Sequence, residues 1–273
     1  MTFLVVGHTG WIGSMITNEL NKRKQKWIGT TCRPENQASF EQELIASNAS
    51  NVIVCIGRTY GPGFNNIDYL EQPGKLQTNI RDNLFGPTII AILCNKYKIH
   101  CTYIGSGCIF EYTNYQKTFY ENSIPNFFGS SYSTVKGYTD LLMRNLNVLN
   151  VRIRMPITSK DEPRNLISKL ISYSSICSIE NSMTVMDDIV PCIIELVLMN
   201  ITGTINMTNP GTISHNTILS LYKKHVDPSF TWVNIESYNN RSNNCLDTTL
   251  FQTYFPHIKN INESVENIMK KFK

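Results

Sequence analysis

Two short stretches of the sequence carry residue types that could reduce a carbonyl group. Tyr132 and Lys136 are four residues apart, so on a helix they would share one face. A tyrosine with its ordinary pKa of about 10 gives up a proton near neutrality only where a cation such as Lys136 stabilises the phenolate. Ser106 and Cys108 follow a strand-like segment at 101–105, and ligands of open α/β sheets bind at such strand ends. These residues therefore predict a carbonyl-reducing site.

The start of the chain supports this interpretation, because a tyrosine and a lysine at this spacing also occur by chance in helices. Residues 2–6 are typical of a buried parallel strand that runs into a glycine-rich turn and then a helix. In such a turn the glycines permit a tight bend, close approach of a diphosphate and packing of the helix on the strand. We therefore expect a dinucleotide to bind at Gly7, Thr9, Gly10, Trp11, Ile12 and Gly13.

The second expected strand is 27–31, and the segment that follows it bears on the choice of cofactor. An acidic residue at this place binds the ribose hydroxyls of NAD, but Arg33 stands there instead. Its guanidinium suits a 2′-phosphate, so we expect NADPH rather than NADH, unless Arg33 is an ordinary solvated side chain. Gly57 after the third strand is also expected to line the cofactor site, and Tyr132 and Lys136 are expected to reach the nicotinamide ribose.

Strand-like segments recur along the chain with helical segments between them. They are 2–6, 27–31, 52–56, 100–104, 148–154 and 203–207. This alternation predicts an α/β fold, a Rossmann-type doubly wound parallel sheet with a small interleaved C-terminal substrate-binding lobe. We expect the dinucleotide-binding domain at 1–155 and the lobe at 156–273, with a strand returning to the sheet near 202–208. The lobe should open with a helix over 163–170, where Pro163 suits the first turn.

Composition narrows the remaining classes of function. The chain has 273 residues, of which 41% are hydrophobic, and its net charge is +4. No apolar run reaches the roughly 20 residues of a membrane span, and Met1 leads directly into the first strand, so we expect a cytoplasmic protein without a membrane partner. The charge forms no basic run, so no nucleic-acid partner is expected. The eight cysteines lack metal-ligand spacing and should be reduced thiols, mostly in the core, as at Cys55, Cys94 and Cys192.

Several longer stretches resemble the extended short-chain dehydrogenase/reductases that modify nucleotide sugars. These stretches are 9–13, 107–112, 125–130, 152–157, 181–185, 208–211 and 241–244, and they extend over nearly the whole chain. Within this family the chain is most similar to the 3,5-epimerase/4-reductases that make UDP-rhamnose, and less similar to the dTDP-4-dehydrorhamnose reductases. The resemblance implies conversion of UDP-4-keto-6-deoxy-D-glucose to UDP-L-rhamnose with NADPH.

The resemblance also implies that Cys108 and Lys169 are an epimerisation pair. Protons on C3 and C5 of a 4-keto sugar are acidic, and inversion requires one group to remove a proton and another to return it. We take Cys108 as the base and Lys169 as the acid, an order that the sequence leaves open because the related GDP-fucose synthases have a histidine in place of Lys169. The alternatives are a small buried hydrophobe for Cys108 and a solvated helix face for Lys169.

Binding of a nucleotide diphosphate requires charge-assisted donors from the C-terminal lobe. Arg241 offers a planar fork of donors, and Asn243 and Asn165 are further candidates. Phe230 and Trp232 could flank the base or belong to the core. The residues do not distinguish a UDP sugar from a dTDP sugar, and they leave a homodimer open.

Two other functions remain open from the sequence. A nucleotide-sugar 4,6-dehydratase or 4-epimerase would recycle a tightly held NAD, but the dehydratase carries an acidic pair where this chain has Gly107 and Cys108. A non-catalytic NADP-sensing regulatory protein of the same fold would typically lose the tyrosine. Retention of Ser106, Tyr132 and Lys136 favours an enzyme.

Overall fold

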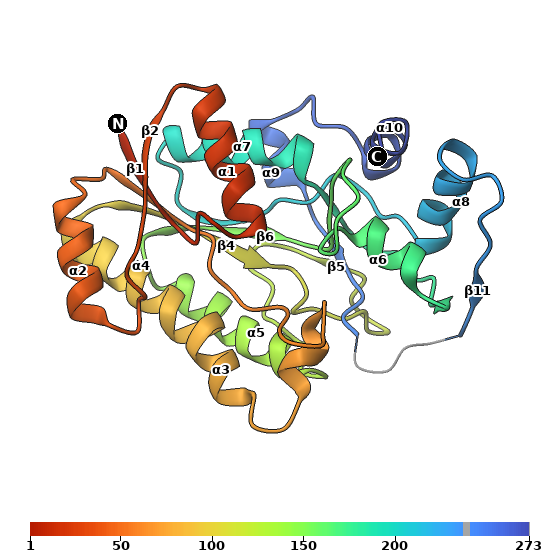
Figure 1. Cartoon of the computed structure of the whole chain (residues 1–273), viewed down its shortest axis with the longest axis horizontal. Coiled ribbons are helices and arrows are strands. Elements are labelled where there is room, and N and C mark those ends of the chain that lie inside the picture. Colours follow the sequence, from red (N-terminus) through yellow and green to blue (C-terminus); the bar gives the residue numbers. More distant parts are fainter. Residues whose placement is uncertain (237–240, 273) are drawn as a thin grey trace. The chain divides into compact units, whose positions relative to one another are not determined.

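The computed structural model describes residues 1–236 and 241–272 (Figure 1). The chain forms two compact units, each built from separate segments. The first unit comprises 1–106, 131–151 and 190–205, and the second comprises 107–130, 152–189 and 206–273. This division differs from the expected boundary after residue 155, because 107–130 groups with the second unit and 190–201 with the first. The packing of Ile109, Phe110 and Phe119 against Leu246 explains the first difference.

A six-stranded sheet lies at the centre of the first unit. Its strands are β1 (Thr2–Val6), β2 (Lys26–Gly29), β3 (Asn51–Val54), β4 (His100–Ser106), β6 (Val148–Ile153) and β10 (Gly203–Asn206). They lie in the order β10-β6-β4-β3-β1-β2, and β1 pairs in parallel with both β2 and β3. The expected doubly wound sheet is therefore confirmed. Because the chain moves to opposite sides of β1, the ends of β1 and β3 form the switch point where such sheets bind ligands.

Helices cover both faces of this sheet. Figure 1 shows α1 (Trp11–Lys22) and α7 (Met186–Leu198) on one face, with α2 (Gln37–Ala46), α4 (Gly86–Tyr97) and α5 (Ser131–Met143) on the other. The 3-10 segment η1 (Ile67–Glu71) is followed by α3 (Leu76–Ile80) and the π-helical turn η2 (Arg81–Phe85), which runs directly into α4. Such π-turns are frequent at functional sites, and this one lies beside the loop that follows β3.

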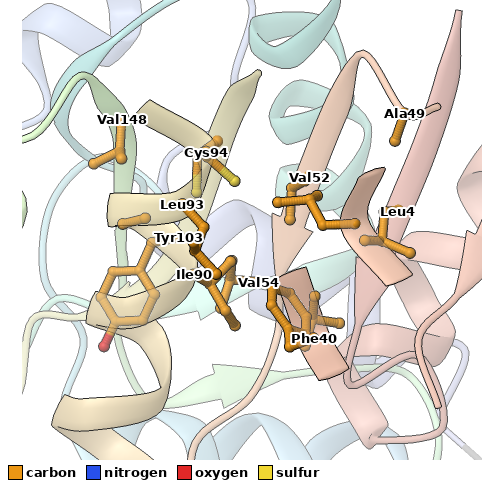
Figure 2. Packing of buried hydrophobic residues seen from close by; sticks show 14 of the residues in the cluster. Leu4, Phe40, Ala49, Val52, Val54, Ile90, Leu93, Cys94, Tyr103 and Val148 are labelled. Carbon is orange, nitrogen blue, oxygen red and sulfur yellow. The ribbon is translucent and has the colours of Figure 1, made fainter. Parts of the chain in front are cut away.

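The core of the first unit fills the space between the sheet and α2 and α4. Leu4, Val52 and Val54 from the strands pack with Phe40 of α2 and Ile90 of α4 (Figure 2). All five side chains are buried, and complete burial of one such side chain contributes about 1.5–3 kcal/mol. This core holds the ends of β1 and β3 in place.

The second unit contains short strands and helices. Its strands are β5 (Thr118–Phe119), β7 (Pro156–Ile157), β8 (Ser175–Ile176), β9 (Thr184–Val185), β11 (Val233–Asn234) and β12 (Cys245–Leu246). Its helices are α6 (Leu166–Ser172), α8 (His215–His225), α9 (Thr249–Tyr254) and α10 (Ile261–Met269). The strands pair in parallel as β5 with β12, β7 with β9 and β8 with β11. Helices α6, α8 and α10 enclose a core that includes Ile167, Leu219 and Val265.

The expected helix over 163–170 begins later than predicted. The structure starts α6 at Leu166, with Asn165 as its N-cap and Pro163 in the preceding turn. The Asn165 side chain accepts a hydrogen bond from the backbone N–H of Ile167 at 3.2 Å. Asparagine is among the preferred N-cap residues, so this side chain fixes where the helix starts. Among the helices of 1–236 and 241–272, none combines the length and apolar character of a membrane span.

Candidate active site

The glycine-rich turn after β1 has the geometry that a diphosphate requires. Gly7 has a φ of +84°, and the N–H of Gly10 donates to its carbonyl oxygen at 3.0 Å. A Cβ at Gly13 would lie only 2.1 Å from that oxygen, so no larger residue fits. Helix α1 then begins at Trp11, and its first turn contains no acidic residue. The amino end of this helix is therefore suited to an anion.

A carboxylate that the sequence pattern did not reveal shapes the loop after β2. Glu43 of α2 accepts hydrogen bonds from the hydroxyl of Thr30 at 2.6 Å, the N–H of Thr31 at 2.7 Å and the N–H of Cys32 at 2.9 Å. Although burial opposes ionisation, these donors lower the pKa of Glu43 to about 2. Because Glu43 is already saturated by the loop, it does not act as the acidic ribose ligand of an NAD enzyme.

Arg33 lies directly beyond this loop and remains accessible. Its side chain is 72% exposed and forms an ion pair with Glu35 at 3.6 Å. Arg81 of η2 contacts the same Glu35 oxygen at 3.2 Å and also pairs with Asp82 at 2.7 Å. Two guanidinium groups from separate elements therefore approach one carboxylate beside the switch point.

The tyrosine and lysine of the expected reductase site lie on α5, as predicted. Tyr132 and Lys136 are both buried, and so is Ser106 at the end of β4, the strand on which α5 packs. Lys136 Nζ donates a hydrogen bond to the hydroxyl of Tyr103 and lies 4.5 Å from the centre of that ring. Lys136 is therefore a buried side chain and not a solvated one.

Tyr103 holds the lysine without neutralising it. Burial raises the pKa of Tyr103 well above its usual value, and negative charge on Tyr132 or Asp140 would raise it further. Tyr103 therefore stays protonated near neutrality. Because it carries no charge, the cation of Lys136 remains available to stabilise a phenolate on Tyr132.

A second carboxylate that the pattern did not reveal fixes the amino end of α5. Glu71 accepts hydrogen bonds from the backbone N–H groups of Ser131 at 2.9 Å and Tyr132 at 3.2 Å. Asn79 of α3 donates to the Ser131 hydroxyl at 2.8 Å. A negative charge at the start of a helix is favourable, so Glu71 both caps α5 and orients the first turn that carries Tyr132.

An asparagine pair connects this helix start to the loop after β3. Asn83 donates to the Asn79 side chain at 2.8 Å and accepts from the backbone N–H of Arg58 at 2.9 Å. Both asparagines are fully buried. Arg58 directly follows Gly57, the residue that we expected to line the cofactor site. Asn83 of the π-turn and Asn79 of α3 therefore connect the expected cofactor loop to α5, the helix that carries Tyr132.

Cys108 lies in the second unit beside a buried arginine. Gly107 donates its N–H to the carbonyl of Ile153 at 2.9 Å, and its own carbonyl accepts from Asn244 at 3.0 Å. Arg154, which follows Ile153, is 1% exposed. Burial lowers the pKa of Arg154, and an ionised Cys108 would raise it again. The fold therefore places a cation beside the thiol that we expected to act as a base.

Lys169 lies on α6 of the same unit and is partly buried. Burial lowers the pKa of Lys169, Arg164 lowers it further, and Glu162 raises it. The side chain of Lys169 is therefore partly shielded from solvent. A lowered pKa brings the amine closer to the range in which it can exchange protons with a substrate.

The expected nucleotide-anchoring residues have different surroundings. Asn165 is fully buried, and its amide hydrogens go to the carbonyls of Thr158 at 2.9 Å and Lys160 at 2.8 Å. This saturation gives Asn165 a structural role in place of the expected substrate contact. Asn243 is partly buried and accepts from Asn181 at 2.9 Å, whereas Arg241 is exposed.

The structure thus groups the expected residues by unit. The first unit holds the glycine turn, Arg33 and Gly57, together with Ser106, Tyr132 and Lys136; the second holds Cys108, Asn165, Lys169, Arg241 and Asn243. The rings of Phe230 and Trp232 stack with their centroids 6.1 Å apart and pack against the core of the second unit. This agrees with the alternative that both residues belong to the core. The eight cysteines are thiols, with Cys94 and Cys192 buried. Burial also raises the pKa of the half-buried Cys55 to about 12.

Comparison with known proteins places the chain among nucleotide-sugar enzymes. The sequence model of the NAD dependent epimerase/dehydratase family matches residues 3–172. The crystal structure of the L780 UDP-rhamnose synthase from Acanthamoeba polyphaga mimivirus is 45% identical, with a TM-score of 0.96 over 99% of both chains.

Two further proteins extend this comparison. A bifunctional dTDP-4-dehydrorhamnose 3,5-epimerase/dTDP-4-dehydrorhamnose reductase from Arabidopsis thaliana is 36% identical over 96% of this chain and 90% of its own length. A dTDP-4-dehydrorhamnose reductase from Clostridium acetobutylicum is 16% identical, with a TM-score of 0.80 over 98% of both chains. This last similarity shows a shared fold.

Proposed function

Because this chain belongs to the NAD dependent epimerase/dehydratase family, we propose that it converts UDP-4-keto-6-deoxy-D-glucose to UDP-L-rhamnose with NADPH. In this proposal it acts first as a 3,5-epimerase and then as a 4-reductase. The observation that carries the proposal is the similarity to a UDP-rhamnose synthase over 99% of both chains. The chain is accordingly an enzyme of nucleotide-sugar metabolism.

The glycine turn fits a dinucleotide, because Gly13 lets helix α1 approach the turn closely: a Cβ there would lie 2.1 Å from the Gly7 carbonyl oxygen. In our proposal Gly7, Thr9, Gly10, Trp11, Ile12, Gly13 and Gly57 hold the cofactor backbone, and Arg33 binds the 2′-phosphate. When bound, NADPH supplies a hydride to C4 of the sugar. The accessible guanidinium of Arg33 supports NADPH over NADH.

Reduction at C4 is assigned to three residues of the first unit. Tyr132 donates a proton to the C4 oxygen, and Ser106 holds that oxygen by a hydrogen bond. Lys136 stabilises the phenolate that remains on Tyr132. The buried position of Lys136 and its hydrogen bond to Tyr103 support this assignment, because they hold the cation in place on α5, the helix that also carries Tyr132.

Epimerisation at C3 and C5 is assigned to two residues of the second unit. Cys108 removes the proton beside the carbonyl, and Lys169 returns one on the opposite face. The cation of Arg154 beside Cys108 supports the role of base, and the lowered pKa of Lys169 supports its proton exchange. Arg241 and Asn243 remain the proposed anchors for the nucleotide diphosphate.

The proposed function is tested by supplying NADPH with UDP- or dTDP-4-keto-6-deoxyglucose and analysing the sugar product. We expect NADPH oxidation and a 6-deoxy sugar with the L-rhamno configuration. A product that is reduced at C4 but keeps the substrate's configuration at C3 and C5 would mean that the enzyme is only a 4-reductase. Absence of NADPH oxidation with both substrates would contradict the proposal.

We further propose that the enzyme works in the cytoplasm as a homodimer. All eight cysteines are thiols, which suits a reducing compartment. Exposed apolar side chains at Phe85, Ile92, Tyr138 and Leu142 on η2, α4 and α5 support self-association. Light scattering coupled to size-exclusion chromatography tests this, and a mass of 31.1 kDa in solution would contradict the dimer.

A further inference from the structure

Two guanidinium groups from different segments of the first unit converge on one carboxylate oxygen. Glu35 Oε1 lies 3.6 Å from Nη1 of Arg33 and 3.2 Å from Nε of Arg81. Arg33 belongs to the loop after β2, whereas Arg81 is the first residue of the π-turn η2. A second cation therefore lies at the loop whose arginine is proposed to bind the 2′-phosphate of NADPH.

The loop that carries this carboxylate is held against the π-turn. The N–H of Asn36 donates to the carbonyl of Arg33 at 3.0 Å, which closes a turn over 33–36. Pro34 in this turn is buried, and a Cβ added at Gly86, the residue that follows η2, would lie 3.7 Å from its Cγ. The packing of this proline at the start of α4 therefore fixes the loop beside the π-turn.

Neither contact to Glu35 is a hydrogen bond. The separation of 3.6 Å from Arg33 is too long for one, and the single N–H on Nε of Arg81 donates to Asp82 at 2.7 Å. The carboxylate is therefore joined to the two arginines by charge attraction alone, and such contacts between partly exposed groups are weak. A ligand that adds hydrogen bonds to its charge can displace Glu35.

Arg81 is anchored on its other side and keeps donors available. Asp82 also accepts a hydrogen bond from Nε of Arg58 at 2.5 Å. Although burial opposes ionisation of Asp82, its hydrogen bonds to the two arginines lower its pKa, so it stays charged and holds Arg81. Within 1–236 and 241–272, the contacts of Arg81 to carboxylates use Nε. Its Nη1 and Nη2 groups are thus left for another acceptor.

A phosphate monoester suits these donors better than a carboxylate side chain does. It carries nearly two negative charges and three acceptor oxygens near neutrality, and arginine binds it through pairs of parallel N–H groups. Arg33 contacts Glu35 through Nη1 and Arg81 contacts it through Nε. Each guanidinium therefore retains further N–H groups with which to hold a phosphate that replaces the carboxylate.

We propose that Arg81 binds the 2′-phosphate of NADPH together with Arg33, and that Glu35 is the counter-ion which this phosphate displaces. This proposal rests on the proposed use of NADPH. Before the cofactor binds, Glu35 offsets the repulsion between the two cations. Because the carboxylate competes with the phosphate, it limits the affinity for NADPH and eases release of the oxidised cofactor after each turnover.

The first test compares binding of 2′,5′-ADP, which carries the phosphate, with binding of 5′-ADP, which lacks it. Arg81→Ala should weaken 2′,5′-ADP binding by about five- to fiftyfold, because a charge-assisted contact is lost. Glu35→Gln should strengthen it by about three- to tenfold, because a competing negative charge is removed. Binding of 5′-ADP should stay within about twofold in both variants. Isothermal titration calorimetry measures all four values.

The matched controls are Lys96→Ala and Glu41→Gln. These two residues form an ion pair at 2.6 Å that joins α4 to α2 away from the π-turn. Each control removes the same charge as the corresponding test variant, and it should leave 2′,5′-ADP affinity within about twofold, because distant exposed charges are screened by salt.

The second test follows cofactor release. Stopped-flow fluorescence of NADPH that dissociates into excess 2′,5′-ADP gives the dissociation rate. Glu35→Gln should slow this rate by about three- to tenfold, since changes in affinity within one interface appear mostly in dissociation. An unchanged rate would contradict the role of Glu35 in release.

The sign of the effect at Glu35 separates competition from support. If Glu35→Gln weakens 2′,5′-ADP binding, Glu35 positions the arginines and is not displaced. Wild-type affinity in Arg81→Ala would remove Arg81 from the phosphate site. If Arg33→Ala alone loses the preference for 2′,5′-ADP, the proposed use of NADPH stands and this inference fails. Wild-type protein that binds both probes equally would overturn both.

Discussion

The Lys136 side chain donates a hydrogen bond to the Tyr103 hydroxyl, and its Nζ lies 4.5 Å from the centre of the Tyr103 ring. The two residues belong to α5 and β4, so the contact crosses from a helix to the sheet beneath it. Tyr103 supplies both an acceptor and an aromatic face, which attracts a cation. This contact fixes the position of the Lys136 amine relative to β4, the strand that ends at Ser106.

Tyr103→Phe tests how much of the reductase activity depends on this contact. The substitution removes the acceptor but keeps the ring, so Lys136 loses one hydrogen bond and retains its aromatic contact. Loss of about 1–1.5 kcal/mol corresponds to roughly a tenfold lower kcat, measured as NADPH oxidation with saturating substrate. KM for the sugar should change little, and the pH profile should keep its shape because Tyr103 does not ionise near neutrality.

The matched control for this variant is Tyr115→Phe, which removes a hydroxyl from an exposed tyrosine outside the proposed sites and the proposed dimer surface. Its turnover should equal that of the wild type. If Tyr103→Phe also keeps wild-type turnover, other contacts position Lys136 and the contact with Tyr103 is dispensable.

Much of the first unit follows from local sequence pattern. Strands β1 and β3 are short apolar runs, and buried parallel strands have this composition. The glycine turn is equally local, because steric limits at Gly7 and Gly13 act within a few residues. Tyr132 and Lys136 were identifiable because helical spacing alone places them on one face.

The features of the site that the sequence pattern did not predict depend on contacts between segments that are distant in the sequence. Glu43 and Glu71 are ordinary polar residues in sequence, and only the folded chain brings them to backbone N–H groups of other segments. The contact between Tyr103 and Lys136 spans 33 residues. Arg154 lies within a stretch that carries the family resemblance, but neither spacing nor charge indicated that it would be buried beside Cys108.

Arg33→Ala tests the proposed recognition of the 2′-phosphate. Loss of a charge-assisted contact worth about 1.5–3 kcal/mol should weaken NADPH binding by roughly ten- to a hundredfold, and NADH binding should stay within about twofold. Fluorescence titration with each cofactor measures both values. Lys26→Ala is the control, because it removes a positive charge from the opposite end of β2. Equal weakening of both cofactors by Arg33→Ala would mean that Arg33 does not read the phosphate.

Glu43→Gln tests the carboxylate that organises the loop after β2. Hydrogen bonds from the loop lower the pKa of Glu43 from 4.5 to about 2 although burial opposes them. The folded pKa lies below the unfolded one, so this stabilisation is present above about pH 4.5 and is lost as the pH falls toward 2. We expect Glu43→Gln to cost about 1–2 kcal/mol at pH 7 and less at pH 3.

Denaturant unfolding at the two pH values measures this difference. Glu111→Gln, at an exposed carboxylate, should change the free energy of unfolding by less than about 0.5 kcal/mol at either pH. A cost of Glu43→Gln that is the same at pH 7 and pH 3 would show that the charge of Glu43 is not what the loop requires.

The two proposed chemistries separate in a comparison of Cys108→Ala with Tyr132→Phe. Exchange at C3 and C5 needs a base and no cofactor, whereas reduction at C4 needs a proton donor and NADPH. Tyr132→Phe should lower NADPH oxidation by about 10²- to 10⁴-fold while largely keeping deuterium uptake from heavy water. Cys108→Ala should lose that uptake and form little UDP-rhamnose, because the reduction follows the epimerisation.

Proton NMR of the sugar ring in heavy water resolves the two positions, and Lys169→Ala should lose uptake or invert only one centre. Cys245→Ala is the matched thiol control, because Cys245 is also half-buried and also interacts with the charge of Arg154. It should exchange both positions at the wild-type rate. If Cys108→Ala does the same, Cys108 is a packing residue, and the epimerase assignment fails while the reductase assignment of Tyr132 is unaffected.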